Sequence, residues 1–167
     1  MYLVEGESMY NFVSPSKGIL SFNDMVEDIL CYIREKPNYE YDIMVGSDSQ
    51  KSYCVKYVVS VIIHRKGKGG RYFYYIRKGS NKVSFQERII TETSYALEVA
   101  TKLQESLIAN RYNLNNITVH ADVGKEGRSK EIIKTVTGMI LASGFKAVIK
   151  PEGIAACSVA DKHSKFQ

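Results

Sequence analysis

The sequence predicts an α/β domain built on a mixed sheet of five strands. Two observations carry this prediction: β-prone segments separated by short turns dominate the first half, and strand-like and helical segments alternate in the second half. An antiparallel meander followed by such alternation indicates a mixed sheet covered by helices. With 167 residues, of which 44% are hydrophobic, the chain has the size and composition of one domain, residues 1–167.

The first 40 residues are expected to form a helical extension packed on this domain. Ser21 is a candidate N-cap, apolar residues follow at helical spacing, and Pro37 ends the pattern. Residues 41–48 have the mostly apolar character of an interior strand. Residues 54–64 and 71–77 are rich in Val, Ile and Tyr and flank a Gly/Lys-rich turn, which predicts an antiparallel hairpin.

The second half alternates between helices and strands. Residues 84–110 predict a long helix with one apolar face, and residues 116–122 return to strand character. A helix from about residue 128 is closed by Gly144, and residues 145–150 form a short strand. Residues 154–164 predict a last helix. After the first helix the predicted order is therefore β-β-β-α-β-α-β-α.

Two aspartates stand at the predicted strand ends. Asp48 ends the first strand and Asp122 ends the fourth. If these strands are parallel neighbours, both carboxylates emerge at one edge of the sheet and can share a divalent metal ion, which prefers oxygen ligands. The alternative is that each aspartate simply forms a turn.

Two further acidic residues are candidates for the same site. On the long helix, only Glu92 borders the apolar stripe, whereas Glu87, Glu98 and Glu105 are expected to face solvent. A carboxylate beside a core is costly unless a cation neutralises it, and the cation is either a metal or the side chain of Arg88 or a lysine. Asp161 follows small residues that allow the last helix to pack closely on the sheet, although a surface salt bridge also explains it.

Three motifs carry a resemblance to a known family: V-G-S-D-S-Q at 45–50, H-A-D-V-G at 120–124 and A-A-C-S-V-A-D-K-H-S at 155–164. With them, nearly the whole chain resembles the YkuK-type family of bacterial ribonuclease-H-like proteins. The resemblance implies the ribonuclease H fold and a site for Mg²⁺ or Mn²⁺. It also implies that Asp48 bridges two ions, that Glu92 and Asp122 complete the shell of one, and that Asp161 holds the other.

The charge distribution favours nucleic acid as the partner. The formal net charge is +5, and basic and aromatic residues gather on the predicted hairpin. The candidates for phosphate contacts and base stacking are Arg65, Lys66, Lys68, Arg71, Tyr72 and Tyr74. A solvated strand rim is the competing interpretation. His163 is a candidate proton shuttle, whereas His120 is expected to be structural and His64 to be exposed at the end of the hairpin.

The sequence therefore leads to a metal-dependent nuclease acting on RNA, DNA or a hybrid. The alternative is a binding module that keeps the fold without turnover, and a structural protein would show the carboxylates paired with lysines. Whether the chain is an enzyme, and its oligomeric state, stay open. The sequence shows neither a signal peptide nor a membrane span, so a cytoplasmic location is expected.

Overall fold

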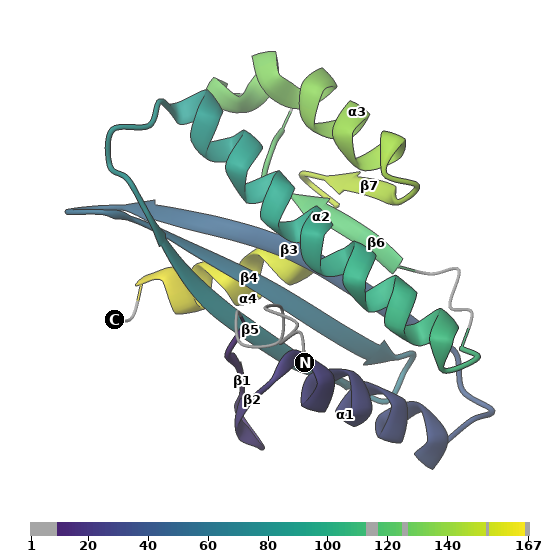
Figure 1. Cartoon of the computed structure of the whole chain (residues 1–167). Helices are drawn as coiled ribbons and strands as arrows, with labels where there is room; N and C mark the ends of the chain where they lie inside the picture. Colours follow the sequence, from purple (N-terminus) through teal and green to yellow (C-terminus); the bar gives the residue numbers. More distant parts are fainter. Residues whose placement is uncertain (1–9, 113–116, 125–126, 153, 166–167) are drawn as a thin grey trace, which may run out of the picture.

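The computed structural model describes residues 10–112, 117–124, 127–152 and 154–165. Within them lies a mixed seven-stranded sheet of order β2-β1-β5-β4-β3-β6-β7 (Figure 1). The strands are β1 Phe12–Ser14, β2 Gly18–Leu20, β3 Tyr41–Lys51, β4 Val55–Arg65, β5 Gly70–Gly79, β6 Ile117–Ala121 and β7 Lys146–Ile149. Neighbours pair antiparallel from β2 to β3, whereas β3, β6 and β7 run parallel.

The five predicted strands are confirmed as β3 to β7, and their order is the predicted one. Strands β3, β4 and β5 form the antiparallel meander, and β6 lies beside β3. The prediction of five strands in total is wrong, because β1 and β2 extend the sheet beyond β5. Each of these two strands has only three residues, too few for an alternating pattern to stand out in the sequence.

The predicted helices are also confirmed. They are α1 Phe22–Glu35, α2 Phe85–Ala109, α3 Ile133–Ala142 and α4 Ile154–Lys165. Ser21 and Ser84 start α1 and α2 with capping boxes closed by Asp24 and Glu87. The third helix starts later than predicted, because a short 3-10 helix, η1 Gly127–Ile132, precedes it.

The helices cover the two faces of the sheet unequally. Helices α1, α2 and α3 lie on one face and α4 lies alone on the other (Figure 1). The larger core joins α1 and α2 to the inward side chains of the strands, such as Ile43, Val61 and Phe73. A second, small cluster joins Val58 and Tyr74 to Ala160 of α4. Among the described residues, no helix combines the length and apolar character that crossing a bilayer requires.

Candidate functional site

Asp48 and Asp122 lie where two parallel strands stop pairing. The recorded pairs of β3 and β6 run from Ile43 with Ile117 to Gly46 with His120, and each aspartate lies two residues further along. Ligand sites of α/β sheets form where neighbouring strands end and separate. The prediction that the strands carrying Asp48 and Asp122 are neighbours is therefore confirmed.

The candidate residues approach β3 from both faces of the sheet. Asp48 stands opposite Val58 of β4, whose side chain packs with Ala160 of α4. Residues directly opposite on paired strands project to the same face, so Asp48 lies on the α4 side. The flanking residues Ser47 and Ser49 project to the α2 side, where they contact Glu92.

Glu92 is held inside the protein by two serines of β3. Its side chain is 5% exposed. The hydroxyl of Ser49 donates to the Glu92 carboxylate, and the hydroxyl of Ser47 donates to the Glu92 backbone oxygen over 2.6 Å. Arg88 Nη1 donates to the backbone and hydroxyl oxygens of Ser49 over 3.0 and 3.1 Å. Glu92 borders the core as predicted and is almost completely buried.

Burial changes the protonation of Glu92. Desolvation, together with the negative charges of Asp48 and Asp122, raises its pKa to about 8, against the hydrogen bond from Ser49 and the charge of Arg88. The charges of both aspartates therefore act on this carboxyl. At neutral pH and without a bound cation, Glu92 is mainly protonated.

Asp122 has a cationic partner. Lys150, just after β7, places its Nζ 2.5 Å from Asp122 Oδ1, and the Asp122 side chain is 29% exposed. This is the lysine pairing that a structural role for the aspartate would produce. The same lysine, however, is 55% exposed, so it can leave the carboxylate at a small energetic cost.

Asp161 and His163 belong to α4, which packs on β3 and β4. Asp161 is half-buried and follows Ala160, which contacts Val58 beside Asp48. His163 instead reaches β5: its ring stacks on Tyr74 with centroids 3.7 Å apart, and its Nε2 lies 3.4 Å from the Tyr72 hydroxyl. Burial lowers the pKa of His163, with help from Lys162. A shuttle role for His163 stays a prediction.

The other glutamates of α2 are only partly as expected. Glu87 and Glu105 are exposed. Glu98 does not simply face solvent, as was predicted. Its side chain is 32% exposed, and it accepts a hydrogen bond from Tyr10 and forms ion pairs with Lys102 and Arg77. The prediction was wrong because Tyr10 precedes β1, an element that the sequence did not reveal.

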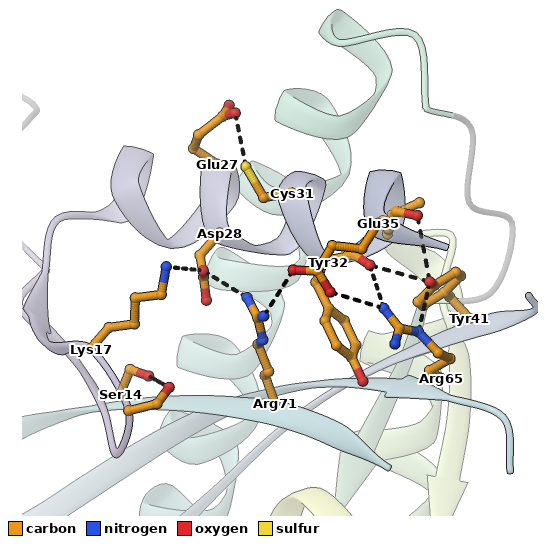
Figure 2. A network of polar contacts seen from close by, with 12 residues as sticks. Ser14, Lys17, Glu27, Asp28, Cys31, Tyr32, Glu35, Tyr41, Arg65 and Arg71 are labelled. Atoms are coloured by element: carbon orange, nitrogen blue, oxygen red, sulfur yellow. Dashed lines mark hydrogen bonds and ion pairs between the residues drawn. The ribbon is translucent and has the colours of Figure 1, made fainter. Parts of the chain in front are cut away.

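The basic residues of the hairpin are mostly engaged within the protein. Arg65 and Arg71 reach from the sheet to α1 (Figure 2). Lys66 pairs with Glu40 at 2.9 Å and with Asp42 at 3.7 Å, and Lys68 is exposed. The glycines of the turn that joins β4 to β5 have positive φ angles, 73° at Gly67 and 86° at Gly69, which explains their presence there.

Tyr72 and Tyr74 project to the opposite face from the two arginines. Tyr74 is buried with Ala160, and Tyr72 is half-buried beside His163. Their expected stacking on bases, like the expected phosphate contacts of the basic residues, stays a prediction.

Three polar residues of this region were missed by the sequence analysis as parts of the site. Ser49 and Lys150 were not considered, and Arg88 was named only as a partner for Glu92. The serines alternate with Asp48 along β3, and this alternation is the signal that could have placed Ser47 and Ser49 on the α2 side.

The acidic residues suit a divalent cation by their chemistry. Hard cations such as Mg²⁺ take carboxylate oxygens, and the raised pKa of Glu92 marks a place where positive charge would be stabilising. Among the residues that the structure describes, no group of three or more Asp, Glu, His or Cys side chains is arranged closely enough to hold a metal ion. Glu92 would have to turn away from Ser49 to join such a group.

Comparison with known proteins agrees with the fold. The family model described as ribonuclease H-like matches residues 24–165. The chain is 28% identical over 167 residues to the uncharacterized protein YkuK of Bacillus subtilis (strain 168), covering 92% of this chain and 96% of that protein. No solved structure matches significantly. Because the family model covers most of the chain, this protein belongs to the ribonuclease-H-like family.

Proposed function

We propose that this protein is a divalent-metal-dependent nuclease that hydrolyses phosphodiester bonds in RNA or DNA by a two-metal-ion mechanism. Family membership suggests a function related to nucleic acid. The observation that supports the enzyme most strongly is that Asp48 and Asp122 follow the point where β3 and β6 stop pairing and that their charges act on the buried Glu92. Acidic groups that repel one another are unfavourable in a protein that only binds a polyanion.

In this proposal, Asp48, Glu92, Asp122 and Asp161 hold Mg²⁺ or Mn²⁺. The ions supply stabilisation of the attacking and departing oxygens of the phosphodiester. Other groups of the protein compete with a cation for these carboxylates. Glu92 must lose its proton before it can bind a cation, and Lys150 competes with a cation for Asp122 Oδ1.

The second candidate is a nucleic-acid-binding module without turnover. The ion pair of Lys150 with Asp122 and the closed environment of Glu92 favour it, because both satisfy the carboxylates without a metal. The two candidates differ in one measurable property, which is cleavage in the presence of a divalent cation.

An activity panel separates the candidates. The purified chain is incubated with labelled single-stranded RNA, single-stranded DNA, both duplexes and an RNA–DNA hybrid, each with Mg²⁺, with Mn²⁺ or with EDTA. The nuclease produces fragments of at least one substrate with a metal and none with EDTA. Binding without fragments across the whole panel would support the binding module instead.

A further inference from the structure

Arg65 and Arg71 form a fixed pair of guanidinium groups at the end of the hairpin. They flank the ring of Tyr32 on α1, with guanidinium carbons 4.0 and 4.5 Å from its centroid. Arg65 donates from Nη2 to the Tyr32 carbonyl over 2.8 Å and from Nε to the Tyr41 hydroxyl over 2.9 Å. Each arginine is therefore held by stacking and hydrogen bonds to groups other than an exposed acid.

Arg71 has its own buried anchor. Its Nη1 lies 2.8 Å from Asp28 Oδ1, and Lys17 Nζ lies 2.9 Å from the same oxygen (Figure 2). The Asp28 side chain is only 4% exposed, and a buried carboxylate keeps its cationic partners because losing them is costly. This contact fixes Arg71 through its Nη1 atom and leaves its Nη2 atom for a different acceptor.

Glu35, at the end of α1, bridges the two arginines on their outer side. Its Oε1 lies 3.2 Å from Arg71 Nη2, and its Oε2 lies 3.4 Å from Arg65 Nη2. Both distances exceed the roughly 2.7–2.9 Å of strong charge-assisted hydrogen bonds. The Glu35 side chain is 50% exposed, whereas Arg65 and Arg71 are 11% and 26% exposed. A half-exposed acid with long contacts thus lies between two fixed guanidinium groups.

We propose that Arg65 and Arg71 bind a backbone phosphate of nucleic acid, and that Glu35 occupies their site until the phosphate displaces it. A phosphate offers more acceptor oxygens than a carboxylate, and guanidinium groups match its geometry. Within the cluster, Lys17, Arg65 and Arg71 face Asp28 and Glu35. Movement of Glu35 away from the pair leaves three cations near one buried carboxylate, a local excess suited to an anion.

The site lies far from the candidate metal ligands. Arg65 pairs with Tyr41 at the start of β3, seven residues before Asp48, which corresponds to about 23 Å along a strand. The pair would therefore contact the nucleic acid far from the bond that is cut, on the face of the sheet opposite to Asp48. This inference rests on the proposed nucleic-acid substrate, but it does not require cleavage.

The test compares two glutamates of α1. Glu35→Gln removes the competing charge. Glu27→Gln is the matched control, because it removes the same charge from a residue that is 59% exposed and pairs with Arg34 instead of Arg65 and Arg71. Affinity of each full-length variant for a fluorescent 20-nucleotide DNA and RNA strand is measured in EDTA over a series of salt concentrations. Thermal unfolding of each variant checks that the fold is kept.

Glu35→Gln should bind about three- to fivefold more tightly than Glu27→Gln, because an exposed ion pair of this kind blocks only part of the population. The slope of log affinity against log salt should be the same in both variants, because the complex makes the same phosphate contact once Glu35 has moved away. Adding Arg71→Lys, which keeps the charge beside Asp28 but not the planar group, should remove the gain.

Equal affinity of the Glu35 and Glu27 variants would overturn the inference, since the effect would then be one of net charge. It would also be overturned if neither variant nor the wild type bound the strands. Because the assay contains no metal, a phosphate site can be confirmed for a protein without nuclease activity, and a nuclease can be found without this site.

Discussion

Two buried carboxylates, Asp28 on α1 and Glu92 on α2, have different electrostatic surroundings in this protein. Asp28 is 6% exposed and Glu92 is 5% exposed. Asp28 lies within 2.9 Å of two cations, Lys17 and Arg71. Glu92 receives a hydrogen bond from the neutral hydroxyl of Ser49, and its burial, together with the charges of Asp48 and Asp122, raises its pKa despite the charge of Arg88.

The difference separates a structural acid from a candidate functional one. A buried charge is tolerated when it is paired, and an acid without close cations becomes neutral instead. Perturbed acids in groups are typical of functional sites. The cluster of Asp28, Lys17 and Arg71 fixes α1 to the hairpin. At Glu92, by contrast, a bound divalent cation would stabilise the ionised carboxylate. Four predictions test this comparison.

The largest effect is expected for catalysis. Asp48→Asn should lower metal-dependent cleavage by at least about a hundredfold, because loss of a ligand weakens the stabilisation of charge in the transition state. Binding of nucleic acid should be nearly unchanged, since it depends on basic groups. Initial cleavage rates and affinities in EDTA are the measurements. Asp122→Asn should behave similarly.

Asp42→Asn is the matched control for this change. Asp42 lies on the same strand and the same face, and its partner is Lys66 at 3.7 Å. If Asp42→Asn lost as much cleavage activity as Asp48→Asn, the effect would not be specific to Asp48, and its role as a metal ligand would be contradicted.

The pH dependence of stability should differ between the wild type and Glu92→Gln in EDTA. The folded-state pKa of Glu92, about 8, exceeds the ordinary value of 4.5. The folded state therefore retains a proton that the unfolded state loses above about pH 4.5. This stabilisation is complete below that pH and is lost as the pH rises toward about 8.

From about pH 5 to about pH 8, the free energy of unfolding of the wild type should fall relative to that of Glu92→Gln by up to about 4 kcal/mol. Denaturant titrations at several pH values measure it, with the exposed Glu105→Gln as control. A constant difference across this range would show that Glu92 is not strongly desolvated, and the contrast with Asp28 would fail.

Asp28→Asn should destabilise the fold by about 3 kcal/mol, because it breaks a buried ion pair and leaves two cations without their shared partner. Urea unfolding at neutral pH measures the change. A loss below about 1 kcal/mol, the value of an exposed ion pair, would mean that water replaces the carboxylate easily and that this cluster is not the structural counterpart of the Glu92 region.

The smallest effect concerns the exposed part of the same cluster. Glu35→Gln should change the free energy of unfolding by only about 0.5 kcal/mol, since its carboxylate is half-exposed and makes long contacts. The same urea titrations measure it. A loss as large as that of Asp28→Asn would show that Glu35 is a structural anchor and would leave no role for it as a displaceable acid.

The sequence alone was sufficient for the main elements and for Glu92. Apolar periodicity, the serine cap of α1 and the glycines of the turn placed the helices and five strands, because these signals depend on residues close together in the chain. Glu92 was singled out from the other acids of α2 by helical geometry alone, and its burial confirms that choice.

Only the tertiary structure decided which charges meet. Lys150 pairs with Asp122 because β7 lies beside β6, and Arg71 pairs with Asp28 because α1 packs near the start of β5. The short strand β1 and the Tyr10–Glu98 contact depend on the same long-range packing. Ion pairs between distant elements leave no local periodicity in the sequence. A basic residue that the sequence suggests as a phosphate contact can therefore form an ion pair with an acidic residue of its own chain.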